Sequence, residues 1–285
     1  MTDTPSLPPL REVIAKHGLT ANKALGQHFL LDANLTDRIA RSIGDLSAGT
    51  TIEIGPGPGG LTRSLLAAGA KVVAIEKDNR FSGPLSELQA AYPSGQLTIV
   101  PADAMTTDTS NLGQSPRRIA ANLPYNIATE LLLQWLDTAT SYETLTLMFQ
   151  REVAARIAAP PGTKAYGRLS VITQWQCNVE TLFHVNPRAF MPPPSVESTI
   201  IRLTPLAQPR HPASRKMLEK VTAAGFGQRR KMLRQSLTPL ILGTSWGTTE
   251  SLCKAVGIDP TARAETLSVK QFCELANTLS NTPEN

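Results

Sequence analysis

Four short apolar runs in the first half of the chain carry its clearest hydrophobic pattern. They span residues 50–54, 71–75, 97–100 and 118–121. Runs of this length that contain many β-branched residues are typical of buried β-strands. Between the first two runs, Leu61, Leu65 and Leu66 recur at the spacing of a helix. This alternation of strand and helix predicts an α/β fold.

The region before these strands has a weaker pattern. Leu10, Val13 and Ile14 have helical spacing, and a second helix is predicted to begin near Asp32 or Asn34, both of which are favoured capping residues. We expect the first ten residues to be mobile.

Polar residues and glycines stand where the four predicted strands end. They are Glu53 with Gly55, then Glu76, Asp103 and Asn122. In an open α/β sheet, ligands bind at the carboxyl ends of the strands, so we expect all of these residues on one edge of the sheet. Asp103 is explained equally well as a helix cap.

A glycine-rich loop, residues 55–60, lies between the first strand and the next helix. Glycines allow the backbone to approach a ligand closely, and the helix N-terminus offers unpaired N–H groups. Gly55, Gly57 and Gly60 satisfy the dinucleotide pattern G-x-G-x-x-G, and Glu76 follows Gly55 at a distance suited to binding ribose hydroxyls. This arrangement fits NAD and S-adenosylmethionine (SAM) equally.

The stretch Asn122, Leu123, Pro124 and Tyr125 suggests recognition of an amino-bearing base. The Asn122 amide oxygen and the Leu123 carbonyl, which precedes a proline, can accept both hydrogens of an aromatic amine. The Tyr125 ring can stack on a base, which is worth about 1–3 kcal/mol. Taken alone, these four residues are also typical of a strand end that enters a turn.

Composition narrows the class of protein. The chain has 285 residues, of which 41% are hydrophobic, enough for a full core. No apolar run approaches the roughly 20 residues needed to span a bilayer, and prolines interrupt the start where a signal peptide needs an apolar run. The three cysteines and four histidines lack metal-ligand spacing. We therefore expect a cytoplasmic protein, a monomer, with neither a metal site nor a membrane partner.

Positive charge is concentrated in the last third of the chain. Residues 202–285 contain 12 Lys and Arg against 6 Asp and Glu, whereas residues 1–201 contain 16 against 17. The proline-containing stretch 204–212 is typical of a linker. We therefore predict two domains, a nearly neutral one at 1–206 and a basic one at 207–285 that suits a polyanionic partner such as RNA.

One basic segment, residues 226–234, is a candidate for contact with phosphates. Projected as a helix, it places Phe226, Leu233 and Leu237 on one apolar face. The cations of the segment are Arg229, Arg230, Lys231 and Arg234. Such a run is often only a solvated helix face, but the surplus of positive charge in this region favours phosphate contact.

Motifs spread over nearly the whole chain resemble those of the KsgA-type ribosomal RNA adenine-N6,N6-dimethyltransferases, which use SAM. They are LGQHFL at 25–30, EIGPGPGGLT at 53–62, Glu76, DA at 103–104, NLPYNI at 122–127, QREVA at 150–154, YGRLS at 166–170, the series Phe190, Pro192, Pro194, Val196 and Ser198, and the series Phe226, Arg229, Arg230, Lys231 and Leu233. Many relatives have Asn where this chain has His28.

The resemblance implies a Rossmann-like class I methyltransferase fold, with a seven-stranded, mostly parallel sheet and a small C-terminal helical domain. It also implies the activity: dimethylation at N6 of two adjacent adenosines near the 3′ end of 16S rRNA, with a role in the biogenesis of the small ribosomal subunit.

The same resemblance implies roles for individual residues. Those implied to bind SAM are His28, Leu30, Gly55, Gly57, Glu76, Asp103 and Asn122, with Glu76 at the ribose and Asp103 at the adenine amine. Those implied at the target base are Asn122, Leu123, Pro124 and Tyr125, together with Phe190 as the second wall of a slot. Asn122 is implied to touch both the methionine side of SAM and the target.

Three other functions account for some of these sequence features. An NAD-dependent dehydrogenase explains the glycines and Glu76 but gives residues 122–125 no role. An erythromycin-resistance methyltransferase acts on 23S rRNA with a similar core, although residues 25–30 and 226–233 favour the small-subunit family. A non-catalytic ribosome-assembly or transcription factor on this fold has no need of Asn122 and Tyr125.

Overall fold

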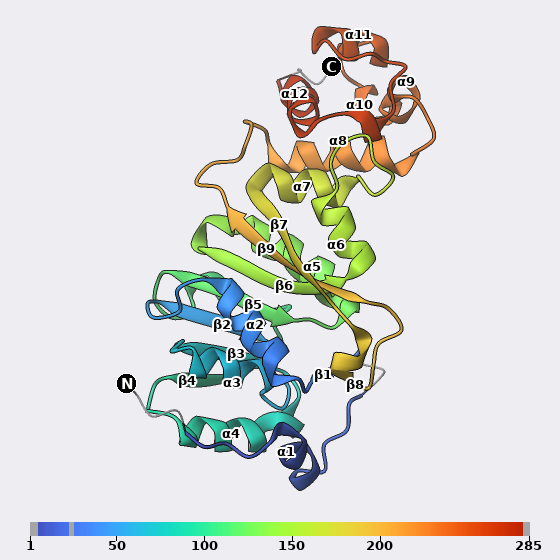
Figure 1. Cartoon of the computed structure of the whole chain (residues 1–285). Helices are drawn as coiled ribbons and strands as arrows, with labels where there is room; N and C mark the ends of the chain where they lie inside the picture. The colour runs from blue at the N-terminus through green and yellow to red at the C-terminus, as the bar shows by residue number, and fades with distance from the viewer. Residues whose placement is uncertain (1–4, 23–25, 282–285) are drawn as a thin grey trace. The chain divides into compact units, whose positions relative to one another are not determined.

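The computed structural model describes residues 5–22 and 26–281 (Figure 1). Leu25 and the first four residues, for which predictions were made, lie outside these ranges. The strands are β1 (Phe29–Leu30), β2 (Thr50–Ile54), β3 (Val72–Glu76), β4 (Leu97–Pro101), β5 (Arg117–Asn122), β6 (Thr144–Gln150), β7 (Cys177–Val185), β8 (Phe190–Met191) and β9 (Ser198–Pro205). All four strands predicted from the apolar runs are therefore confirmed, to within one residue at each end.

The helices include those predicted early in the chain. They are α1 (Leu10–Lys16), α2 (Ala33–Ile43), α3 (Gly60–Ala67), α4 (Ser82–Ala91), α5 (Tyr125–Asp137), α6 (Arg151–Ala158), α7 (Arg168–Gln176), α8 (Arg215–Gly227), α9 (Leu233–Ser236), α10 (Thr238–Ile241), α11 (Thr249–Ala255) and α12 (Val269–Ser280). Asp32 caps α2, since its side chain accepts from the backbone N–H groups of Asn34 and Leu35.

The main sheet has seven strands in the order β4-β3-β2-β5-β6-β9-β7. The pairings from β4 to β6 are parallel, and β9 runs antiparallel to β6. Because β2 lies between β3 and β5, the connections on its two sides diverge, and a crevice opens at the carboxyl ends of these strands. The seven-stranded, mostly parallel sheet expected from the resemblance is thus confirmed.

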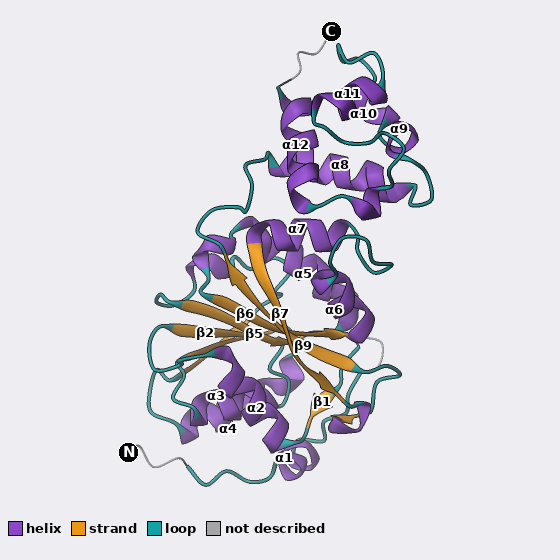
Figure 2. Cartoon of the chain, turned by 45° about the horizontal axis from the view of Figure 1, so that its top comes forward, coloured by secondary structure: helices purple, strands orange, loops and turns teal. Residues whose placement is uncertain are grey.

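Helices α2, α3 and α4 cover one face of this sheet (Figure 2). Ile39, Leu65 and Leu88, one from each helix, are buried in a cluster with strand residues such as Ala74 and Ala120. Since alternate residues of a strand point to opposite faces, this cluster marks one of the two buried sides of β3 and β5, and Ile75 and Ile119 are buried on the other. The burial holds the strand ends in a fixed arrangement.

The start of the chain is more ordered than expected. Within the described residues, Leu7 packs against the core cluster beneath α3, and the Pro8 carbonyl accepts a hydrogen bond of 2.6 Å from Arg63 Nη1. The prediction of mobility is wrong for residues 5–10, because burial of an apolar side chain offsets the entropy lost on ordering it.

The chain divides into two compact units, and the division differs in one respect from the predicted domains. One unit comprises residues 1–154 and 180–205, the other residues 155–179 and 206–285. Residues 155–179 belong to the second unit because α7 packs on α8 and α12, and Trp175 Nε1 donates to the His211 carbonyl at 2.7 Å. The later boundary between the units lies between residues 205 and 206.

The basic segment does not form the single helix that was predicted. Helix α8 ends before Gln228, whose backbone has φ −124° and ψ 61°, and α9 begins only at Leu233. The N–H groups of Leu233 and Arg234 donate to the carbonyls of Ala262 and Pro260, at 2.8 and 3.0 Å, instead of to the preceding turn. These contacts with a distant loop replace the hydrogen bonds that would continue α8.

Across the described residues, no helix has both the length and the apolar character required to span a membrane.

Candidate active site

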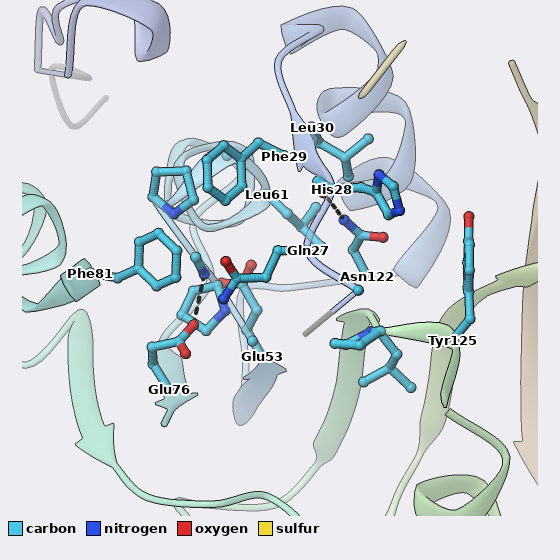
Figure 3. Close-up of a pocket in the computed structure, with 18 residues that line it drawn as sticks. Gln27, His28, Phe29, Leu30, Glu53, Leu61, Glu76, Phe81, Asn122 and Tyr125 are labelled. Atoms are coloured by element: carbon cyan, nitrogen blue, oxygen red, sulfur yellow. Dashed lines mark hydrogen bonds between the residues drawn. The ribbon is translucent and has the colours of Figure 1, made fainter. Parts of the chain in front are cut away.

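A cleft lies at the carboxyl ends of β2, β3 and β5 and holds about 730 Å³, including its solvent-filled opening. Figure 3 shows the residues that line it. Nine of the residues predicted for the site are among them: His28, Leu30, Gly55, Gly57, Glu76, Asn122, Leu123, Pro124 and Tyr125. In the register of the sheet, Glu76 on β3 and Asn122 on β5 flank Gly55 on its two sides.

The glycine loop forms the floor of the cleft. Gly55 and Gly57 have φ of 66° and 56°, which only glycine adopts without strain, and a Cβ on either would meet open space. At Gly60 the reason for glycine differs, because a Cβ would lie 2.6 Å from the Leu30 carbonyl oxygen of β1. The loop thus leaves backbone open to a ligand while β1 packs closely behind it.

Glu76 is held from two sides by backbone N–H groups. One oxygen accepts from Gly57 at 3.0 Å and the other from Asp78 at 2.8 Å. Burial raises the pKa of Glu76, and these two hydrogen bonds oppose the rise. Each carboxylate oxygen has a second lone-pair direction, so both can still accept from a ligand hydroxyl.

Asn122 ends β5 with a defined amide orientation. Its Nδ2 donates to the His28 carbonyl oxygen at 3.2 Å, and a carbonyl can only accept, so the amide oxygen must face the other way. Figure 3 shows this oxygen turned toward the side of the cleft that carries Tyr125. Asn122 therefore presents an acceptor where a ligand amine can reach it.

Three rings stand along this side of the cleft. The His28 ring centroid lies 6.1 Å from that of Tyr125 and 6.3 Å from that of Phe190. The Tyr125 hydroxyl is 2.6 Å from Ser198 Oγ, and His28 Nδ1 is 2.7 Å from the Pro192 carbonyl oxygen. Since that oxygen can only accept, Nδ1 carries the proton.

Phe190 and Asp103 are not among the lining residues. Phe190 is only 5% exposed and packs in the core cluster, with its ring edge toward His28. Asp103 accepts from the Met105 N–H at 3.0 Å and pairs with Lys77 Nζ at 2.7 Å. These contacts lower the pKa of Asp103, Lys77 contributing most. Asp103 therefore caps a turn, and no helix begins in residues 104–108 that follow it, so the helix cap that was one of its two interpretations is not formed.

Comparison with known proteins identifies the family. A family model described as Ribosomal RNA adenine dimethylase matches residues 18–281. The chain belongs to this adenine dimethylase family. The resemblance stated from the motifs is confirmed, and the chain is a SAM-dependent methyltransferase that acts on ribosomal RNA.

Two curated relatives in the adenine dimethylase family are named Ribosomal RNA small subunit methyltransferase A. The relative from Rhodospirillum rubrum is 60% identical over 271 residues, covering 95% of this chain and 92% of the relative. The relative from Paramagnetospirillum magneticum is 61% identical over 274 residues, covering 96% and 95%.

Solved structures show that the fold is shared. A dimethyladenosine transferase from Plasmodium falciparum superposes with a TM-score of 0.76 at 23% identity, covering 87% of this chain and 96% of that one. The 23S rRNA methyltransferase ErmE superposes with a TM-score of 0.67 at 26% identity, covering 89% and 100%.

The cleft of this dimethylase fits SAM. The open space over Gly55 and Gly57 can take a ligand backbone, and the Glu76 carboxylate can take paired hydroxyls. When bound, SAM supplies a methyl group already activated by its sulfonium leaving group.

Sequence reasoning missed several residues of the cleft. Gln27 and Phe29 line it although they were given no role within the motif at 25–30, and Phe81 lines it although no local pattern marked it. Phe81 is 1% exposed and meets Phe29 edge-on, with 5.7 Å between the ring centroids. Only the packing of distant segments brings these side chains to the cleft.

Glu53 was placed at the sheet edge by its position, but its burial was not foreseen. It lines the cleft, is 2% exposed, and its Oε2 has no hydrogen-bond partner among the described residues. Burial raises the pKa of Glu53 to about 8, Thr62 opposes the rise, and the charge of Glu76 adds to it. Glu53 is therefore mostly protonated at neutral pH.

The predicted RNA-binding cations fall into two groups. Arg229 is held by three acceptors, with Nε 3.1 Å from Glu265 and Nη2 2.5 and 2.8 Å from the carbonyls of Lys164 and Tyr166. The other three are exposed and have no side-chain hydrogen bond or ion pair within residues 5–22 and 26–281: Arg230, Lys231 and Arg234.

Proposed function

We propose that this chain dimethylates N6 of two adjacent adenosines near the 3′ end of 16S rRNA and so takes part in small-subunit biogenesis. The small-subunit names of relatives at 60% and 61% identity support this target. We further propose that it acts in the cytoplasm, as a monomer, without metal or membrane.

The single observation that carries the chemistry is the orientation of Asn122. Its Nδ2 is engaged by the His28 carbonyl, which leaves the amide oxygen to accept a hydrogen of the target amine. The Leu123 carbonyl, ahead of Pro124, accepts the second hydrogen. Both bonds become stronger as positive charge develops on the nitrogen, so they stabilise the transition state more than the ground state. Since the leaving group is already activated, positioning supplies most of the remaining catalysis.

The target adenine stacks on Tyr125 in this proposal, with Phe190 as the second wall. Phe190 is only 5% exposed, so its ring must become more accessible before a base can stack on it. Leaving the RNA stack costs a few kcal/mol, which stacking on Tyr125 offsets.

The cofactor occupies the part of the cleft next to the glycine loop and the strand ends. His28 and Leu30 border the methionine end of SAM, Gly55 and Gly57 lie against its backbone, and Asn122 touches the methionine side. Glu76 accepts from the ribose hydroxyls, which suits a carboxylate held open by backbone N–H groups. Asp103 accepts from the adenine amine, which requires it to release or share the Lys77 ion pair.

RNA phosphates are contacted by the exposed cations of the basic segment. Arg230, Lys231 and Arg234 are available for this role. Arg229 is also predicted to bind RNA. To contact a phosphate it must give up at least one of its three acceptors in the protein or use an N–H group that they leave free. The first unit would then carry out methyl transfer, and the second would bind RNA phosphates without sequence specificity.

Methyl transfer from labelled SAM to undermethylated small ribosomal subunits tests this function, with mapping of the modified nucleotides. We expect label on two adjacent adenosines near the 3′ end of 16S rRNA, appearing far more slowly with Asn122→Ala. Label confined to 23S rRNA would replace the proposal with an erythromycin-resistance activity. Binding to small subunits without transfer would instead favour an assembly factor.

A further inference from the structure

Three side chains beside the cleft form a connected group, which we name the clasp: Gln27, Asp78 and Arg80. Gln27 Nε2 donates to Asp78 Oδ2 at 2.9 Å, and its Oε1 accepts from Arg80 Nη2 at 3.1 Å. Arg80 Nε donates to both Asp78 oxygens, at 2.9 and 3.1 Å. Every pair within the group is therefore joined directly.

The clasp connects two segments that are far apart in sequence. Gln27 immediately precedes His28 and itself lines the cleft. Asp78 lies two residues after Glu76, and its backbone N–H donates to Glu76 at 2.8 Å. Arg80 extends the connection to the earlier segment, since Nη1 donates to the Thr20 carbonyl at 3.1 Å. The segment before β1 is thus tied to the loop after β3.

The chemistry of the clasp suits a permanent connection. Hydrogen bonds from Arg80 contribute most to lowering the pKa of Asp78 to about 2, so the carboxylate stays charged at neutral pH. Gln27 is neutral and uses its amide N–H on the anion and its oxygen on the cation. An amide can bridge the ion pair in this way, whereas an apolar side chain of the same length cannot.

We propose that the clasp is a positioning device that sets the separation of the two halves of the cofactor site. The inference rests on the proposed function, in which His28 and Leu30 border the methionine end and Glu76 holds the ribose. A ligand that spans both halves benefits from their fixed separation, because less ordering is left for binding to supply. A ligand that fills only the ribose half does not.

The test compares two ligands by calorimetry. S-adenosylhomocysteine spans both halves, whereas 5′-methylthioadenosine lacks the amino-acid portion and reaches only the nucleoside half. Arg80→Ala should weaken the binding of S-adenosylhomocysteine about tenfold and that of methylthioadenosine less than twofold. Loss of charged hydrogen bonds that position the methionine half of the site affects only the ligand that occupies that half. At saturating SAM, kcat should stay near the parent value while KM for SAM rises.

A second variant separates bridging from folding. Gln27→Met keeps a similar side-chain length but removes the amide's bonds to Asp78 and Arg80, and also the bond from the Asn22 backbone N–H at 3.0 Å. It leaves the Asp78–Arg80 ion pair in place and should show the same selective loss. The control is Lys16→Ala, which removes an exposed ion pair with Glu87 outside the cleft and should leave both affinities unchanged. Equal loss of both ligands, or no loss of either, in folded Arg80→Ala and Gln27→Met overturns the proposal.

Glu76→Ala distinguishes this failure from a failure of the proposed cofactor site. It should weaken both ligands, because both carry the ribose. If Glu76→Ala leaves both affinities unchanged, the ribose assignment is wrong, whatever the clasp variants do.

Discussion

The cleft and the basic segment 226–234 hold their polar side chains in different ways. In the cleft, Glu76 and Asn122 each bond to backbone groups of another segment, which leaves only selected atoms open to a ligand. In the basic segment, Lys231 and Arg234 are exposed without such bonds in the described structure. Directional chemistry needs the first arrangement, whereas contact with phosphates along an RNA tolerates the second.

Arg229 does not follow the pattern of its neighbours. Its guanidinium binds two carbonyls and the Glu265 carboxylate, so it is held as firmly as the cleft residues although it lies in the basic segment. Charge alone therefore does not assign a residue to ligand binding.

Asn122→Ala should reduce the rate of methyl transfer about 10²–10³-fold, as loss of one preorganised group at a site of developing charge does. RNA affinity should change little, because the phosphate contacts lie elsewhere. Single-turnover assays and filter binding measure the two quantities. A parallel loss of both would mean that Asn122 binds RNA and has no specific part in the chemistry.

Glu53→Gln should change how stability depends on pH. The native pKa of about 8 is raised above the ordinary value of 4.5, so native Glu53 keeps a proton that the unfolded chain releases. Stability from this group is full below pH 4.5 and is lost as pH rises to 8. The expected loss is several kcal/mol, because each unit of difference between the native and unfolded pKa corresponds to about 1.4 kcal/mol. Urea unfolding at pH 5 and pH 8.5 should show a flatter profile for Glu53→Gln, and an unchanged profile contradicts the assignment.

Glu76→Ala should weaken SAM binding by about 1.5–3 kcal/mol, the range for hydrogen bonds to a charged group. Calorimetry on the folded variant measures this. Glu87→Ala is the matched control, since Glu87 pairs with Lys16 and His17 outside the cleft. An equal effect of the two variants would show that the loss is not specific to the ribose.

Arg229→Ala should lower the free energy of unfolding by about 1–3 kcal/mol, because it leaves the carbonyls of Lys164 and Tyr166 without their donor. Arg230→Ala, its exposed neighbour, should have no such effect. Thermal unfolding of the two variants makes the comparison. Equal stability of Arg229→Ala and the parent protein would mean that the contacts of Arg229 do not stabilise the fold. Arg229 would then be as available for RNA as Arg230.

Lys231→Ala or Arg234→Ala should have the smallest effect, a few-fold loss of affinity that is similar for unrelated RNAs. Each should reduce the magnitude of the log–log salt slope by roughly 1, since one phosphate contact is lost. SAM affinity should be unchanged. Filter binding across a salt series decides the matter, because an unaltered slope means that these cations are only solvated.

Sequence alone determined the local elements and the chemistry at their ends. Apolar runs fixed β2 to β5 because a buried strand needs little more than such a run. Positive φ at Gly55 and Gly57 requires glycine, so the loop could be recognised before its shape was known. Glu76 and Asn122 could be selected as candidate site residues because they stand at strand ends, which the sheet brings to one edge.

Tertiary structure alone decided how these side chains are held. The carbonyl that orients Asn122 lies 94 residues away, one that binds Arg229 lies 63 away, and Arg80 meets Gln27 across 53. The break between α8 and α9 likewise depends on the carbonyls of Pro260 and Ala262. Local propensity depends on neighbours within a few residues, whereas these hydrogen bonds exist only after the chain has packed distant segments together.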